Sequence, residues 1–290
     1  MILVTGATGD TGRAVVGGLV GAGAAVRAMV RRAEQASSFP AGVEVVVADM
    51  TQPDSLPAAV KGIEQMLLIS PLEPSLVELQ GEMAAAARHG GVRRIVKIST
   101  EIADPESEAL IGRWHGLAER AVEATGLAFF HLRPCNFMQN LYAFAGEIAS
   151  SGSFSAPLGM ARISLVHVDD LAAVTVAALL KSDLGNGSLA VTGADRPTYE
   201  EFAQALSAAL GRQIRYEATT PEMAHQRFLA AGMPAWKAQE LLRMYAYLQD
   251  PRNTQTTDAV RAFVGRAPHP FEGFVKEYAA RLVAGVKSHG

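Results

Sequence analysis

Three glycines near the start of the chain, Gly6, Gly9 and Gly12, stand three residues apart directly behind an apolar run. Glycines with this spacing allow a sharp turn in which main-chain N–H groups approach a phosphate, and the N-terminus of a following helix attracts the same negative charge. The segments 1–5 and 13–23 have the composition of a strand and a helix, which is the setting this motif requires. The sequence therefore predicts a dinucleotide-binding turn, with an ordinary glycine-rich connection as the alternative. The residues expected in the turn are Gly6, Thr8, Gly9, Asp10, Thr11 and Gly12.

Two adjacent arginines, Arg31 and Arg32, end the second apolar run, where a site for NAD(H) usually carries Asp or Glu for the ribose hydroxyls. A guanidinium offers a fixed fork of donors to phosphate oxygens. The pair favours the 2′-phosphate of NADP(H) over NAD(H). The alternative is a solvated pair at a helix start, partly neutralised by Glu34.

Two further positions follow strands at the edge where a nucleotide should lie. Asp49 ends the third run, and its carboxylate suits an adenine amino group, although capping of the next helix explains it equally well. Ser70 and Pro71 close the fourth run. We expect both positions to form walls of the nucleotide site.

Six short apolar runs alternate with helical or connecting sequence up to about residue 134, and their near-continuous apolarity is typical of a parallel sheet covered on both faces. Right-handed crossovers then give a Rossmann-like, doubly wound α/β fold. We expect a nucleotide-binding domain at 1–150 and a smaller, mostly helical C-terminal domain at 151–290, with a return strand near 187–193. In the second domain, Thr198 and Glu201 form a capping box before a helix.

The composition excludes several classes of protein. A formal charge of -3 gives no basic field for nucleic acid. A single cysteine, Cys135, excludes an intrachain disulfide and a multi-thiolate metal site, which agrees with the cytoplasm. We expect no export signal, membrane span or bound metal, because the apolar runs are short and the histidines and acidic residues lack ligand spacing. Asp169 and Asp170 instead indicate the first turn of a helix.

The order of the motifs TGATGDTG, RAMVRRAEQ, VVADMTQPDSL, LRPCNFMQN and HVDDLAAVTVAAL resembles the NmrA-like group of atypical short-chain dehydrogenases over nearly the whole chain. That group includes type 2 quinone oxidoreductases, triphenylmethane reductases and nucleotide-sensing regulators. The resemblance implies an NAD(P)(H)-binding sheet domain and a smaller domain that together form a cleft. Besides the glycine turn and the two arginines, it implies cofactor contacts from Asp49, Met50, Ser70, Pro71, Ser99, His115, Pro134, Asn136 and Phe137.

The catalytic pair of typical short-chain dehydrogenases is missing. Those enzymes use Tyr-x-x-x-Lys on a helix with a Ser at the end of the fifth strand. Ser99 is present, but the alignment places Ile111 at the tyrosine position and His115 at the lysine position, and the helix sequence 108–126 holds no Tyr and no Lys. His115 is a candidate for a ribose contact or a proton relay. The alternative is a helix-surface histidine beside Trp114.

Hydride transfer needs no protein nucleophile, because a nicotinamide reduces a planar acceptor when a cleft aligns the two and excludes water. The expected cleft residues are Phe137, Met138 and Tyr142, whereas Phe144 and Cys135 are interpreted as packed residues.

Two functions follow from these features. The first is an NADPH-dependent reductase of a quinone, dye or similar planar acceptor, with His115 and Ser99 as candidate catalytic residues. The second, suggested by the missing Tyr and Lys, is a non-catalytic NADP(H) redox sensor that acts through a protein partner. A reductase or isomerase of a biosynthetic intermediate is a third reading. A homodimer is compatible with each.

Overall fold

The computed structural model describes residues 1–253 and 255–285, which form two compact units. Unit 1 comprises Met1–Pro134, Val168–Val191 and Ala259–Arg266. Unit 2 comprises Cys135–His167, Thr192–Asp258 and the segment from Ala267 onward. In the described part of the chain, no helix combines the length and the apolar character needed to span a bilayer.

Unit 1 is built on a seven-stranded sheet whose neighbouring strands all run parallel, in the order β10-β6-β5-β4-β1-β2-β3. This arrangement confirms the Rossmann-like α/β fold, and β10 is the predicted return strand. The strands are β1 (Ile2–Val4), β2 (Val26–Val30), β3 (Glu44–Val47), β4 (Gln65–Leu68), β5 (Arg94–Ile98), β6 (Ala128–Pro134) and β10 (Gly187–Val191).

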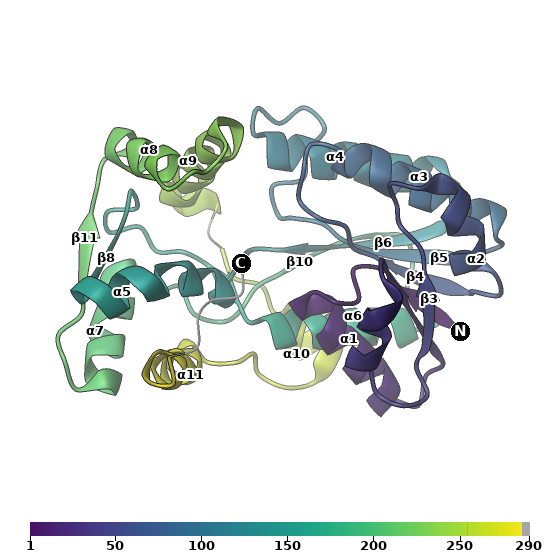
Figure 1. Ribbon diagram of the computed structural model, residues 1–290, viewed down its shortest axis with the longest axis horizontal. Helices are drawn as coiled ribbons and strands as arrows, with labels where there is room; N and C mark the ends of the chain where they lie inside the picture. The colour runs from purple at the N-terminus through teal and green to yellow at the C-terminus, as the bar shows by residue number, and fades with distance from the viewer. Residues whose placement is uncertain (254, 286–290) are drawn as a thin grey trace. The chain divides into compact units, whose positions relative to one another are not determined.

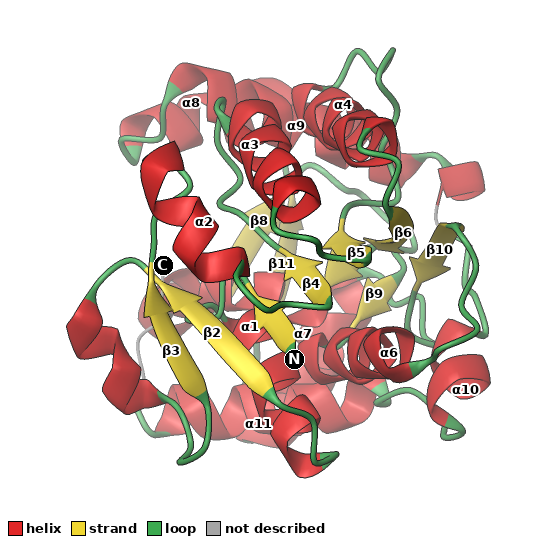
Figure 2. Ribbon diagram, turned by 90° about the vertical axis from the view of Figure 1, so that its right-hand side faces the viewer, coloured by secondary structure: helices red, strands yellow, loops and turns green. Residues whose placement is uncertain are grey.

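Helices cover both faces of this sheet, which is why the central strands are apolar on both sides. One face carries α2 (Leu56–Val60), α3 (Leu76–His89) and α4 (Leu110–Ala124), and the other carries α1 (Asp10–Gly21), α6 (Val168–Leu180) and α10 (Ala259–Val264) (Figures 1 and 2). Short 3-10 helices lie at Ala33–Ser38 and Pro53–Ser55. The predicted acidic turn opens α6, where the buried Asp170 accepts a hydrogen bond of 2.7 Å from Arg266.

The glycine turn links β1 to α1 through a backbone conformation and a close contact that favour glycine. Gly6 has a φ of +58°, a region that L side chains rarely adopt. A Cβ at Gly12 would lie 2.2 Å from the Gly6 carbonyl oxygen and 2.8 Å from Ala7 Cα. The first turn of α1 therefore packs directly on the end of β1, as the glycine spacing predicts.

Unit 2 packs around a cluster of aromatic and aliphatic side chains that includes Phe154, Phe202, Phe274 and Tyr278. Its elements are β7 (Asn136–Phe137), the 3-10 helix η3 (Met138–Phe144), α5 (Ala145–Ser151), β8 (Ser153–Ala156), β9 (Leu165–Val166), α7 (Tyr199–Leu210), β11 (Arg215–Ala218), α8 (Pro221–Ala230), α9 (Ala235–Gln249), the 3-10 helix η4 (Pro251–Asn253) and α11 (Phe271–Val283). The predicted capping box is present at the start of α7, where Thr198 Oγ1 accepts from Glu201 N at 3.0 Å.

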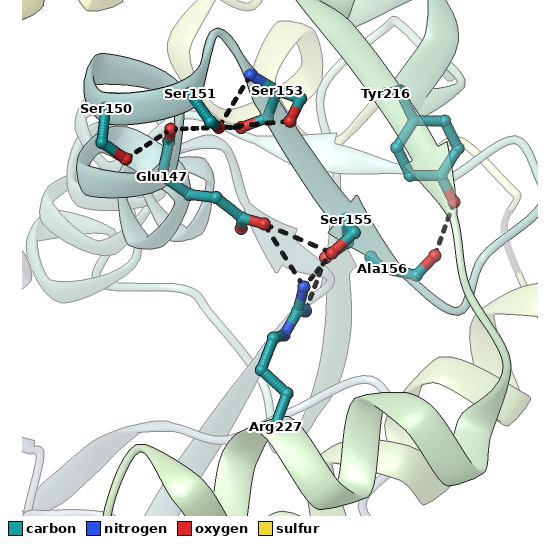
Figure 3. A network of polar contacts seen from close by, with 8 residues as sticks. All are labelled: Glu147, Ser150, Ser151, Ser153, Ser155, Ala156, Tyr216 and Arg227. Carbon is teal, nitrogen blue, oxygen red and sulfur yellow. Dashed lines mark hydrogen bonds and ion pairs between the residues drawn. The ribbon is translucent and has the colours of Figure 1, made fainter.

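A polar network joins α5, β8 and α8 within unit 2 (Figure 3). Arg227 on α8 donates to the hydroxyl and to the carbonyl oxygen of Ser155, and its Nη1 lies 3.5 Å from Glu147 Oε1 on α5. Tyr216 on β11 donates to the carbonyl oxygen of Ala156 at 2.8 Å. These contacts fix α8 to the β8–β11 pair.

The boundaries of the units differ from the expected division at residue 150. Unit 2 begins at Cys135, because Leu141, Phe144 and Ile148 are buried in its own core cluster. The segments that carry α6 and α10 belong to unit 1, since these helices cover its sheet. Each unit is formed by three separate segments of the chain, and a single division point in the sequence could not predict this, because it depends on contacts between distant segments.

Replacing Gly12 with Ala tests the contact between α1 and the glycine turn. The new Cβ would meet backbone atoms that cannot move aside, so we expect a loss of roughly 2 kcal/mol or more in the free energy of unfolding. Gly17 is the matched control, because it is exposed on the same helix and a Cβ there meets nothing within 4 Å. Gly17→Ala should be neutral or stabilising by up to about 1 kcal/mol. Urea unfolding of both variants measures the difference, and equal effects would contradict the packing argument.

Candidate functional site

A cavity of about 310 Å³ lies in unit 1 where the carboxyl ends of β1, β2, β3 and β4 meet. In a doubly wound sheet this edge is where ligands bind. The lining residues are Gly6, Thr8, Gly9, Met29, Val30, Arg31, Ala48, Asp49, Met50, Thr51, Ile69, Ser70, Pro71, Glu73 and Leu79. Eight of these, from Gly6 to Pro71, are residues that the sequence analysis assigned to a cofactor site, and the fold brings them together around one space.

The wall formed by the glycine turn is held in place by Thr5, which sequence reasoning missed. Its buried hydroxyl donates to the carbonyl oxygen of Ile69 at 2.8 Å and accepts from the Ile69 N–H at 2.8 Å. These bonds fasten the end of β1 to the end of β4, and Ile69 lies 3.0 Å from the position of a Cβ at Gly6. Thr8, Gly9 and the start of α1 follow directly, so main-chain N–H groups and the helix N-terminus stand at the cavity.

The two arginines have different positions. Arg31 lines the cavity at the end of β2. Arg32 is exposed, and its Nε lies 3.3 Å from Glu34 Oε1 in the partial neutralisation that the sequence allowed. Of the two arginines, Arg31 is among the residues that line the cavity.

The polar residues on the other walls have local structural partners as well. Asp49 Oδ1 accepts from the N–H and from the hydroxyl of Thr51, each at 2.9 Å, which is the turn-forming role weighed against an adenine contact. Ser70 Oγ accepts from Gln80 Nε2 at 2.9 Å. Met50 is buried at the cavity wall.

A second cluster lies one strand further along the sheet, where Lys97 of β5 meets His115 of α4. Lys97 is completely buried, its Nζ lies 3.0 Å from His115 Nδ1, and it donates to the carbonyl oxygen of Ile98 at 3.3 Å. Because an amino group paired with a ring nitrogen normally donates, His115 Nδ1 acts as the acceptor and the ring proton resides on Nε2. His115 is partly buried, whereas Lys97 is completely buried.

The two groups change each other's titration. Burial lowers the pKa of Lys97 to about 7, although the Glu119 carboxylate opposes this effect. Burial, together with the nearby Lys97 charge, holds the pKa of His115 well below its usual range. At neutral pH the imidazole is therefore uncharged and the lysine stands close to its midpoint.

The carboxylate nearest this cluster is already paired. Arg133 on β6 forms two hydrogen bonds with Glu119 on α4, with an Nε–Oε1 distance of 3.0 Å. Burial is the largest single influence and would raise the pKa of Glu119, but the interactions with Arg133, Ser99 and His131 together lower it. On the next turn of α4, Glu123 Oε1 lies 3.1 Å from His131 Nε2. Among the described residues, no carboxylate lies within ion-pair distance of Lys97.

The two candidate catalytic residues, Ser99 and His115, both lie in unit 1. Ser99 follows β5 and is buried, and His115 lies on α4 as the alignment indicated. Glu101, two residues after Ser99, is also buried enough to raise its pKa to about 7. Sequence reasoning missed Lys97, whose signal was a lone lysine inside the apolar strand sequence RIVKIS.

The remaining candidates divide between the units. Pro134 ends β6 in unit 1, whereas Asn136 and Phe137 form β7 in unit 2 and pair with β9. Met138 was expected in a cleft, but it is fully buried in the unit 2 core, so this expectation is wrong. Tyr142 is partly buried and stacks on Tyr278 with ring centroids 4.9 Å apart.

Two residues that were interpreted as packed, Phe144 and Cys135, are buried. Phe144 is buried in the unit 2 core, as predicted. Cys135 is buried and unbridged. His167 and His269, which are far apart in sequence, have ring centroids 4.5 Å apart in unit 2.

The comparisons with known proteins assign the family. The NmrA-like family matches residues 1–275, and the chain belongs to it. The NAD(P)H azoreductase of Xenophilus azovorans is 37% identical over 285 residues, which cover 98% of this chain and 100% of that protein. A (4-alkanoyl-5-oxo-2,5-dihydrofuran-3-yl)methyl phosphate reductase of Streptomyces griseus is 34% identical, covering 96% of this chain and 98% of that protein. Among solved structures, the NADP(H) complex of Citrobacter sp. triphenylmethane reductase has a TM-score of 0.86 at 25% identity, over 96% of this chain and 100% of that one.

The burial of Lys97 has a consequence for stability. Its pKa is lowered on folding, so below about pH 7 the folded state must hold a buried charge that the unfolded chain hydrates, and this penalty fades as pH rises toward 10.5. Lys97→Met should therefore stabilise the protein by roughly 2 kcal/mol at pH 6, and the gain should shrink by pH 9. Urea unfolding at both pH values measures this, and a gain that stays constant or grows with pH would contradict the assigned titration.

Proposed function

We propose that this protein is an NADPH-dependent reductase that transfers hydride to a planar acceptor such as an azo compound or a quinone. The observation that carries the proposal is the unit 1 cavity, in which the glycine turn, the start of α1 and Arg31 converge. The family and the azoreductase, at 37% identity over almost the whole chain, support it.

The residues present fit a dinucleotide. The space at Gly12 is so limited that a Cβ would strike the turn, so the start of α1 lies directly against the turn that lines the cavity. Glycine turns of this kind bind a diphosphate through main-chain N–H groups. Arg31 supplies a cation at the β2 end, where a 2′-phosphate would add charge-assisted hydrogen bonds. Met50 and Asp49 provide an apolar and a polar wall for the adenine. When bound, the reduced nicotinamide supplies the hydride.

The acceptor needs to be positioned, and no covalent intermediate is required. The related proteins act on an azo compound, a dihydrofuranone phosphate and, as their names state, triphenylmethane dyes. Azo compounds and quinones are planar two-electron acceptors of this kind. We place this reaction in the cytoplasm, in keeping with the single cysteine.

The direct test mixes the purified protein with NADPH and a panel of azo dyes and quinones. We expect loss of the NADPH absorbance that depends on both the protein and an acceptor. Binding of NADPH without oxidation by any acceptor would contradict the reductase and favour the redox sensor. A sensor would further require different affinities for NADP+ and NADPH, measured by calorimetry.

The KM values for NADPH and NADH test whether Arg31 binds the 2′-phosphate. Arg31→Ala should raise the KM for NADPH by about 10- to 100-fold, because a charge-assisted contact to the 2′-phosphate is worth roughly 1.5 to 3 kcal/mol, and should change the KM for NADH little. Arg32→Ala is the matched control, since its guanidinium is exposed beside Glu34. Steady-state KM values for both cofactors measure this. An equal loss in the two variants, or a loss that also affects NADH, would contradict the assignment of Arg31.

A further inference from the structure

Lys97 and His115 lie near the rim of the sheet that carries the cavity. The strand order β5-β4-β1 puts the end of β5 beside β4, whose end carries the cavity residues Ile69, Ser70 and Pro71. The carboxyl ends of parallel strands share one edge, and Lys97 Nζ reaches the carbonyl oxygen of Ile98 at that edge. The cluster and the cavity therefore belong to the same rim of the sheet.

We propose that His115 is the group that protonates the acceptor and that Lys97, acting through His115, supplies the replacement proton. This proposal rests on the proposed reductase function and adds its proton source. The 3.0 Å contact between Lys97 Nζ and His115 Nδ1 is the path, and His115 is placed at its outer end because it is partly buried whereas Lys97 is completely buried.

The proposed reduction transfers one hydride and one proton to the acceptor. The hydride carries two electrons from NADPH to one atom of the acceptor, leaving NADP+. The His115 Nε2–H bond breaks and its proton joins the other acceptor atom, while a proton leaves Lys97 Nζ and binds His115 Nδ1. His115 remains uncharged in its other tautomer, Lys97 becomes a neutral amine, and solvent later returns the proton to the pair. The acceptor gains one hydride and one proton.

The surroundings favour this route over an imidazolium. Lys97 faces His115 and Glu119 on α4 and His131 and Arg133 on β6. Glu119 pairs with Arg133 and Glu123 pairs with His131, so neither carboxylate forms an ion pair with Lys97. Burial, assisted by the positive charge of Arg133, lowers the pKa of Lys97 to about 7, while the low pKa of His115 keeps its ring neutral.

The chemistry of the acceptors provides a selective test. A neutral azo dye or a quinone takes up a hydride and a proton, whereas a cationic triphenylmethane dye such as crystal violet is neutralised by the hydride alone. At saturating NADPH, Lys97→Met and His115→Gln should lower the ratio of azo-dye reduction to crystal violet reduction in a single turnover by about 100-fold, the usual scale of general acid catalysis. An equal loss with both dyes would contradict the proton relay. The double variant should lose no more than either single one, because the two residues act in one path.

Lys97→Arg separates charge from proton transfer. A guanidinium keeps the positive charge but cannot give up a proton at working pH. Azo reduction should stay low in this variant as in Lys97→Met. Recovery to the wild-type rate with Arg would overturn the relay and leave Lys97 an electrostatic role only.

The pH dependence of azo-dye reduction tests the relay even if the wild-type protein does not reduce crystal violet. Azo reduction should fall as pH rises through about 7, where Lys97 loses its proton, and this fall should disappear in Lys97→Met. Glu101→Gln is the control, because Glu101 also titrates near 7 at the end of β5. If Glu101→Gln removes the alkaline fall while Lys97→Met retains it, the relay is wrong and Glu101 is the proton donor.

The protonation of His115 can also be measured by NMR in the absence of cofactor and acceptor. In the unloaded protein, the ring ¹⁵N signals of His115 should show a protonated Nε2 at pH 6 and should shift as pH passes about 7, because its Nδ1 partner changes charge. Lys97→Met should abolish this shift. A His115 signal that does not respond to Lys97 overturns the relay. If the His115 signal does respond to Lys97 but none of the acceptors is reduced by NADPH, the reductase function is refuted instead. The two failures are therefore distinguishable.

Discussion

The contact between Gly12 and the carbonyl oxygen of Gly6 is the constraint on which the cavity depends. A Cβ at Gly12 would lie 2.2 Å from that oxygen, so the first turn of α1 rests on the backbone of the turn itself. Thr5 fixes the same turn from the other side through its bonds to Ile69. With β1, α1 and β4 joined in this way, the edge of the sheet has room for a ligand approached by main-chain donors.

A buried cation next to this edge is an energetic cost that the fold does not offset fully. The sheet places Lys97 beside His131 in register, and α4 covers both residues. The acidic residues of α4 pair with Arg133 and His131 instead of Lys97. A buried, incompletely compensated lysine with a pKa near neutrality beside a binding cavity is typical of functional sites, because a core that only had to be stable would carry an apolar side chain there.

The sequence predicted the features that depend on neighbouring residues. The glycine spacing, the capping box at Thr198 and the apolar strands each express a local rule, and the fold follows them. Features that depend on distant contacts were missed or wrong. Lys97 was read as part of a strand, because its pairing with His115 exists only once α4 packs on β5. Met138 was assigned to a cleft, yet the unit 2 core covers it fully. Arg31 and Arg32 are adjacent in sequence and both exposed, but only Arg31 lines the cavity, whereas Arg32 lies beside Glu34.

In the proposed relay, the lysine takes a different place from the one it has in the Tyr-x-x-x-Lys pair of typical short-chain dehydrogenases. In the typical pattern, a helical lysine acts on a tyrosine one turn away, and the tyrosine exchanges the proton. Here the helix position of that lysine carries His115, and a lysine enters from β5 to meet it at 3.0 Å. Lysine remains the neighbour that tunes the proton donor, but the donor is now an imidazole that can pass a proton through its two nitrogens without becoming charged. This matters in a buried site, because an imidazolium next to Lys97 and Arg133 would add a third positive charge. A neutral relay avoids that repulsion, so the same cationic surroundings that rule out an imidazolium make proton release from Lys97 favourable.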